Sequence, residues 1–141
     1  MPSWILFALL SALFAALVAI FGKVGLQGID PTFGATLRAW VMGIFLLFVS
    51  FILGKLGKIE FQTLPPRIFI FILLSGIAGA LSWLFYFFAL KTGPASGVVA
   101  LDRLSIIFVF LFATAFLAET FTWKAAMGAL FILVGAILMI L

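Results

Sequence analysis

Apolar stretches long enough to cross a membrane recur along this chain, and they restrict its fold more than any other feature. The hydrocarbon core of a bilayer is about 30 Å thick, which an α-helix of roughly 20 residues spans. Windows of that length fit the sequence at about 3–22, 32–53, 68–90, 95–117 and 123–141. Because only helices and closed barrels satisfy their backbone in lipid, we predict an all-α fold. It is an integral membrane bundle of five transmembrane helices, forming a single domain over residues 1–141.

The composition excludes several classes of function. Of the 141 residues, 67% are apolar and 9% are charged, whereas about a quarter of a soluble domain is charged. The sequence has no Cys and no His, which removes their metal-ligand and acid–base chemistry. It also has no nucleotide-binding loop and no clustered carboxylates, so we expect no cofactor, no metal and no enzyme activity. The net charge of +4 fits basic residues at membrane borders rather than a nucleic-acid-binding face.

Helix start signals divide the apolar stretches. Asp30 and Pro31 suit the N-cap and first position of the second helix, and Thr122 can cap the fifth. The connection at 91–94 is so short that the third and fourth helices must form an antiparallel hairpin. The first stretch lacks a basic leader and exceeds a signal sequence in length, so we expect it to be retained as a helix.

Basic residues predict the orientation, because cytoplasmic loops are enriched in them. With the N-terminus inside, the cytoplasmic side holds Lys55, Lys58, Arg67 and Lys124, and the outer side holds Lys23 and Lys91. Counting Arg38 and Arg103, which lie inside spans near their outer ends, removes this excess. We expect an inner-membrane protein with a cytoplasmic N-terminus, and insertion in both orientations stays open.

Charged residues inside the spans are the first candidates for a functional site. Arg38 lies about 9 Å into the second span, and Asp102 and Arg103 lie about 10–12 Å into the fourth, from the same side. A salt bridge between Arg38 and Asp102 would lower the cost of either charge in hydrocarbon. Such a pair either binds a transported solute or only fixes the packing of the helices. In the second case, the Arg103 side chain extends to the outer lipid headgroups. Asp102, and after it Glu119, are the candidates for proton coupling; an interfacial ion pair is the simpler reading of Glu119.

Small and polar residues recur on one face of the third helix at i, i+4, i+7 and i+11: Ser75, Gly79, Ser82 and Tyr86. This face either packs against a helix or borders a cavity. Trp83 and Tyr86 could line that cavity or anchor at the interface. Glycines 128 and 135 on the last helix indicate packing first, and Gly97 lies in a hairpin cap.

Several segments together resemble a known family. The most specific runs are G-P-A-S-G-V-V-A-L-D-R-L-S at 93–105 and L-A-E-T at 117–120. Looser matches are Lys23, I-D-P at 29–31, A-T at 35–36 and Arg38. The chain resembles a single-repeat, five-helix member of the EamA branch of the drug/metabolite transporter superfamily. Leu101 and Ile106 stand where relatives often carry prolines that would break the fourth helix.

The resemblance implies one inverted-repeat unit and export of amino acids, other metabolites or drugs. Since duplicating a five-span unit inverts the second copy, we expect a homodimer in the bilayer, antiparallel in arrangement. A parallel dimer and a heteromer stay open. The predicted substrate pocket near mid-membrane is lined by Arg38, Ser82, Trp83, Tyr86, Asp102 and Ser105. In it, Arg38 or Arg103 holds an anionic group, and Asp102 binds a proton or a substrate amine. The alternative function is a non-transporting subunit that stabilises or regulates a partner transporter.

Overall fold

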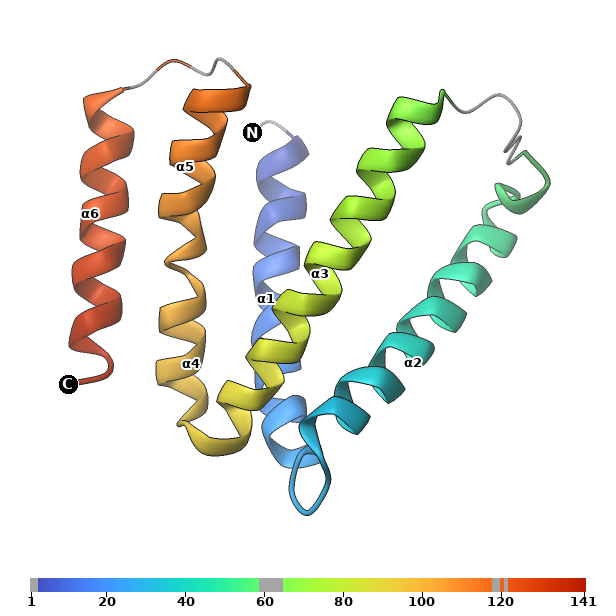
Figure 1. Cartoon of the computed structure of the whole chain (residues 1–141), viewed down its shortest axis with the longest axis horizontal. Helices are drawn as coiled ribbons and strands as arrows, with labels where there is room; N and C mark the ends of the chain where they lie inside the picture. The colour runs from blue at the N-terminus through green and yellow to red at the C-terminus, as the bar shows by residue number, and fades with distance from the viewer. Residues whose placement is uncertain (1–2, 59–64, 118–119, 121) are drawn as a thin grey trace. The chain divides into compact units, whose positions relative to one another are not determined.

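Helices make up all the regular structure in the part of the chain that the computed structural model describes, residues 3–58, 65–117, 120 and 122–141. In chain order (Figure 1) they are α1 (Ser3–Gly25), α2 (Pro31–Ile52), the 3₁₀ turn η1 (Leu56–Lys58), α3 (Pro66–Thr92), α4 (Ala95–Asp102), α5 (Ser105–Phe116) and α6 (Trp123–Leu138). The predicted all-α class is confirmed.

Four stretches are long and apolar enough to cross a membrane: α1, α2, α3, and α4 with α5 over Ala95–Phe116. The protein is therefore a multi-pass membrane protein. The last helix, α6, is apolar but has 16 residues, a length of about 24 Å. The helix ends at Leu138, and the predicted span continues to 141.

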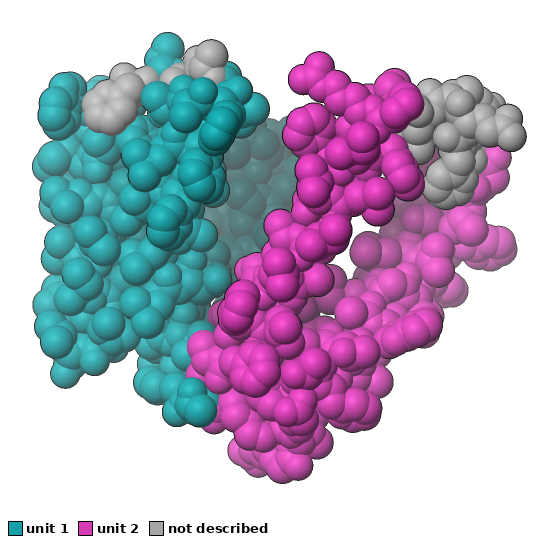
Figure 2. Space-filling model, in the orientation of Figure 1, with its two compact units in different colours: residues 1–23, 92–141 teal, residues 24–91 magenta. Residues whose placement is uncertain are grey.

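The chain forms two compact units (Figure 2). Unit 1 comprises Met1–Lys23 and Thr92–Leu141, and unit 2 comprises Val24–Lys91. Unit 2 thus contains α2, η1 and nearly all of α3, while unit 1 contains α4, α5, α6 and most of α1. The prediction of a single domain over 1–141 stays a prediction.

The predicted helix starts of α2 and α6 are confirmed. The Asp30 carboxylate accepts hydrogen bonds from the backbone N–H groups of Thr32, at 2.8 Å, and Phe33, at 3.2 Å. The Thr122 hydroxyl accepts one from the N–H of Ala125 at 3.3 Å. Each cap satisfies N–H groups that the first turn of a helix leaves without an intrahelical partner.

The helix predicted over 95–117 is interrupted after Asp102. The N–H groups of Leu104, Ile106 and Ile107 bond to carbonyls three residues earlier, at 2.9, 3.1 and 2.9 Å, instead of four. This is the tighter 3₁₀ pattern, with poorer hydrogen-bond geometry than an α-helix. The fourth span is therefore two short helices, although neither proline of the related sequences is present. Asp102 ends α4, and Ser105 begins α5.

Lysine side chains hold the turns at one end of each unit. In unit 1, Lys23 Nζ donates a hydrogen bond to the Gly93 carbonyl at 2.8 Å, which joins the end of α1 to the turn before α4. In unit 2, Lys91 Nζ donates to the Ile29 carbonyl, which joins the end of α3 to the loop before α2. In that loop, Gly28 has a φ of 79°, a left-handed conformation that favours glycine.

Candidate functional site

The candidate site lies in unit 2 between α2 and α3, and the Lys91 bond to Ile29 joins these helices at one end. Arg38 is seven residues after Pro31, so it lies about 10 Å along α2. Trp83 is eight residues before Lys91, so it lies about 12 Å back along α3. Because that bond joins the end of α3 to the loop before α2, the two side chains meet at the same depth within their spans.

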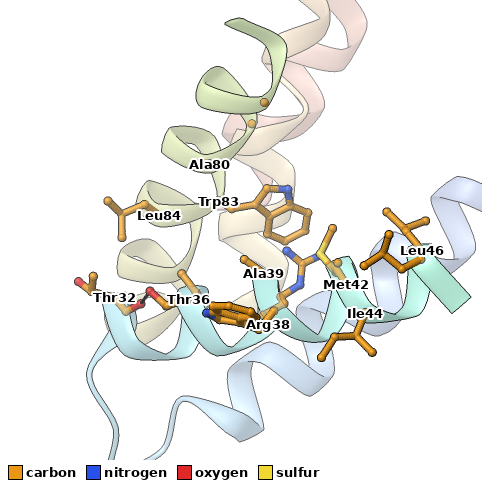
Figure 3. A pocket seen from close by; sticks show the side chains of 16 residues that line it. Thr32, Thr36, Arg38, Ala39, Met42, Ile44, Leu46, Ala80, Trp83 and Leu84 are labelled. Carbon is orange, nitrogen blue, oxygen red and sulfur yellow. Dashed lines mark hydrogen bonds between the residues drawn. The ribbon is translucent and has the colours of Figure 1, made fainter. Parts of the chain in front are cut away.

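A pocket of about 800 Å³ opens around this pair. Its volume lies within the range of about 300–1,000 Å³ that is usual for small-molecule sites. The lining comes from both helices (Figure 3): Thr32, Ala35, Thr36, Arg38, Ala39, Trp40, Met42, Gly43, Ile44, Leu46 and Leu47 of α2, and Gly76, Gly79, Ala80, Trp83 and Leu84 of α3. Most of these side chains are apolar or small, and Arg38 is the charged residue among them.

The Arg38 guanidinium is stacked on the Trp83 indole. Its central carbon lies 3.3 Å from the ring centroid, and 5.8 Å from that of Phe87. Both Arg38 and Trp83 are half-buried, and Figure 3 shows them pointing toward each other. Attraction between a cation and an aromatic face is worth about 0.5–2 kcal/mol, increasing as water is removed. The stack therefore holds a positive charge in place inside a membrane span.

Two further aromatic rings fix the orientation of the indole. Tyr86 meets Trp83 edge-on, with 5.4 Å between centroids and 74° between planes. Phe87 meets it at 6.1 Å and 90°. Edge-to-face pairs of this kind add roughly 0.5–1.5 kcal/mol beyond the area that they bury. Tyr86 lies outside the pocket lining, so in this structure it supports the site through Trp83.

Face stacking leaves the in-plane N–H groups of the guanidinium available for a ligand. Within unit 2, no hydrogen bond from the Arg38 guanidinium to a described residue is present. The Thr36 hydroxyl donates to the Thr32 carbonyl at 2.8 Å, so its oxygen can still accept a bond. The site can therefore bind a carboxylate through two parallel N–H···O bonds, the arrangement that a guanidinium favours.

The predicted site residues divide between the two units. Arg38 and Trp83 line the pocket together, whereas Ser82 is exposed on α3 outside the lining. Asp102, Arg103 and Ser105 are exposed residues of unit 1, at the interruption between α4 and α5. Since Arg38 and Asp102 belong to different units, their salt bridge stays a prediction. Glu119 lies outside the described residues.

Small residues in the lining were missed by sequence reasoning. Residues 32, 36, 39 and 43 on α2 follow the spacing i, i+4, i+7, i+11, the same signal that was used for α3. On α3 the lining runs through Gly76, Gly79, Ala80 and Trp83. Of the predicted stripe, only Gly79 belongs to it. The lining face is thus displaced by one residue, or about 100° around the helix, from the face through Ser75 and Ser82.

The structure therefore defines a class of protein: a multi-pass helical membrane protein with a positively charged side chain, that of Arg38, held in a pocket within its spans. The sequence matches the EamA-like transporter family over residues 2–141. The chain belongs to this family, and it is a membrane transporter. It is also 41% identical over 138 residues to a Sinorhizobium protein named as an uncharacterized transporter in the cobO 3′ region, covering 97% of this chain and 96% of that protein. No solved structure matches the chain. Family and relative point to a transporter rather than an enzyme.

Proposed function

We propose that the protein is a secondary transporter that exports small metabolites, such as amino acids or drugs, across the inner membrane. The observation that carries the proposal is the half-buried Arg38, stacked on Trp83 in a pocket of about 800 Å³ between α2 and α3. A charge within a membrane span is costly, and where it occurs it usually belongs to a solute or ion pathway. Here the pocket leaves the hydrogen-bonding edge of that charge open to a ligand.

In the proposed mechanism Arg38 binds an anionic group of the substrate, and Asp102 binds the coupling proton. The interruption between α4 and α5 supports this role for Asp102. In many secondary transporters, coupling ions bind where a membrane helix is discontinuous, because unwound backbone offers polar groups at that depth. Alternating protonation of Asp102 would then drive the exchange between inward-facing and outward-facing states.

The proposed working form is a homodimer with its two copies inserted in opposite directions. Five crossings place the ends of one copy on opposite sides of the membrane. A transporter built from inverted repeats needs a second unit of opposite orientation. The near balance of Lys and Arg at the two borders supports such dual insertion, with the cytoplasmic N-terminus as one of the two orientations.

Flux through proteoliposomes tests the proposal. Metabolites that raise the melting temperature of the purified protein are first selected, and their transport is then measured for the wild type and for Arg38→Gln and Asp102→Asn. We expect each substitution to lower the flux at least tenfold while the oligomer in detergent is unchanged. Arg67→Gln is the matched control, since Arg67 also lies near an aromatic ring, 5.9 Å from that of Phe71, but outside the pocket.

Two results would refute it. Unchanged flux in the Arg38 and Asp102 variants would show that transport does not depend on these two charges. A protein without flux, whose Asp102→Asn variant loses only its association with a partner transporter, would identify the non-transporting subunit instead.

A further inference from the structure

The pocket of unit 2 carries positive charge and an apolar wall, and this combination narrows its ligand. We infer that the substrate class is the amphipathic monocarboxylate: one carboxylate on a small aromatic or branched apolar body, in preference to zwitterionic amino acids and to organic cations. This inference rests on the proposed transport function and names the substrate of the same site.

The carboxylate end is recognised by Arg38. Its guanidinium is held by its face, at 3.3 Å from the Trp83 centroid, so its edge keeps a fixed direction. A fixed planar fork binds the two oxygens of a carboxylate with little loss of side-chain entropy. The Thr36 hydroxyl oxygen, whose proton is donated to the Thr32 carbonyl, offers an acceptor but no second cation. The site therefore neutralises one negative charge.

The rest of the ligand meets an apolar surface. Met42, Leu46 and Leu47 of α2 and Ala80 and Leu84 of α3 give the pocket an apolar lining. Burial of apolar ligand surface contributes roughly 25 cal/mol per Å², so a phenyl ring or branched chain gains affinity here. A very small anion such as acetate lacks this contribution.

An ammonium group finds no anionic partner among the described residues that line this pocket. None of the described residues that line it carries a carboxylate. The α-ammonium of an amino acid would therefore be moved from water to a site beside Arg38, where it meets no counter-charge and is repelled. This cost distinguishes phenylalanine from the same molecule without its amine. In this scheme Asp102 of unit 1 binds the coupling proton and not a substrate amine.

Binding of matched probes to the full-length protein in lipid nanodiscs tests the inference, with isothermal titration calorimetry as the readout. 3-Phenylpropanoate, L-phenylalanine and 2-phenylethylamine share one apolar body and differ in charge. We expect 3-phenylpropanoate to bind at least about tenfold more tightly than phenylalanine, the difference that one poorly paired buried charge readily produces. We expect no binding of phenylethylamine and at least tenfold weaker binding of acetate.

Variants connect this selectivity to the stack. Arg38→Gln should abolish binding of 3-phenylpropanoate, and Arg67→Gln should leave it unchanged. Arg38→Lys keeps the charge without the planar fork and should weaken binding severalfold. It serves where Arg38→Gln fails to fold, which circular dichroism and gel filtration reveal. Trp83→Leu removes the ring that directs the fork and should also weaken binding severalfold.

The outcomes separate this inference from the transport function. Equal or tighter binding of phenylalanine or phenylethylamine overturns the inference, whether or not either is transported. Selective binding of 3-phenylpropanoate without flux in proteoliposomes supports the ligand class and overturns the proposed transport. Oleate, a lipid that also carries one carboxylate on an apolar body, is titrated as a competitor. Displacement of 3-phenylpropanoate by oleate at equal concentration overturns the assignment to a small metabolite.

Discussion

Arg38 shows how one residue can keep its charge inside a membrane span and still be available for binding. The aromatic face of Trp83 takes the place of part of the water that the guanidinium would have outside the membrane. An acidic partner would stabilise the cation more strongly, but it would also occupy the edge that recognises an anion. Stacking therefore suits a binding residue better than a salt bridge does.

The sequence predicts that Arg38 and Trp83 line one pocket, but it does not predict that their side chains are in contact. Arg38 stands out in the sequence because a charge in an apolar span is rare, and Trp83 because it lies in the outer half of its span, where an aromatic residue could line a cavity or anchor at the interface. Which face of α3 meets α2 depends on contacts between distant parts of the chain, such as the bond between Lys91 and the Ile29 carbonyl. That contact joins residues 62 positions apart, so no local pattern of the sequence contains it.

The Asp30 cap gives a prediction at the residue scale. The N–H of Phe33, and with it that of Thr32, holds the pKa of the Asp30 carboxyl below its usual range, against a smaller opposing effect of desolvation. A lowered folded-state pKa means that the stabilisation is complete above the unfolded value, near 3.9, and is lost as the pH falls through the folded value. We expect the wild type to melt at a higher temperature than Asp30→Asn at pH 6. The difference should begin to shrink below about pH 3.9 and should disappear below the lowered folded-state value.

Melting curves in detergent from pH 3 to pH 7 measure this effect. Asp30→Ala, which removes the acceptor altogether, should melt below both proteins at pH 6. A gap between wild type and Asp30→Asn that is the same at pH 3 and pH 7 would show that the ionised carboxylate contributes nothing to the cap.

At the element scale, the interruption between α4 and α5 sets this span apart from the continuous α1. The bonds of Leu104, Ile106 and Ile107 follow the 3₁₀ pattern, which opens more readily than an α-helix. We expect amide hydrogen exchange in residues 101–107 to be faster than in the centre of α1. Mass spectrometry of the protein in nanodiscs, read in peptides from both regions, measures the difference. Equal protection in the two peptides would mean that the fourth span behaves as one continuous helix.

The position of each helix followed from the sequence, but this interruption did not. Apolar runs of about 20 residues fix where spans lie, because the bilayer sets their length. The segment 101–105 contains neither Pro nor Gly, the residues that usually break a helix. Its Asp102 and Ser105 are only weak breakers, through local side-chain bonds to the backbone. In relatives with proline at these positions a helix break is expected, and in this chain the helix is interrupted without proline.

Close packing between α4 and α6 gives a second prediction for elements. A Cβ atom added at Gly97 would lie 3.2 Å from Ile140 Cγ2 and 3.3 Å from Pro94 Cγ. Gly97→Leu should therefore lower the free energy of unfolding by about 1–3 kcal/mol, the usual cost of overpacking. Gly128→Leu on α6 is the matched control, because a Cβ there meets no described atom of unit 1 within 4 Å.

Unfolding in mixed micelles with increasing SDS measures both variants. Equal losses in the two would assign the effect to leucine in a membrane helix rather than to contact with Ile140. The control also bears on the packing that Gly128 and Gly135 suggest in the sequence. If Gly128→Leu alone lowered the free energy of unfolding, Gly128 would be packed against a surface outside unit 1.

On the scale of the whole molecule, two lysines that hold turns also belong to the charge pattern from which the orientation is predicted. Lys23 and Lys91 bond to turn carbonyls within their units, and they are also the basic residues of the predicted outer border. Counted together with Arg38 and Arg103, they equal in number the four basic residues of the opposite border, Lys55, Lys58, Arg67 and Lys124. Orientation responds to such differences of Lys and Arg near the ends of spans. If the chain inserts in both orientations as proposed, the residues that hold the turns also contribute to the balance between the two.

Removing these two charges should therefore select one orientation. In the wild type we expect C-terminal fusions to alkaline phosphatase and to green fluorescent protein both to be active, because copies insert both ways. In the double variant Lys23→Gln/Lys91→Gln, the amide side chains can still donate to the turn carbonyls, but the outer border loses both charges. The phosphatase signal should rise and the fluorescence should fall as the C-terminus moves outside. Lys55→Gln/Lys58→Gln should produce the opposite shift. Activity of one fusion alone in the wild type would refute dual insertion, and with it the antiparallel dimer.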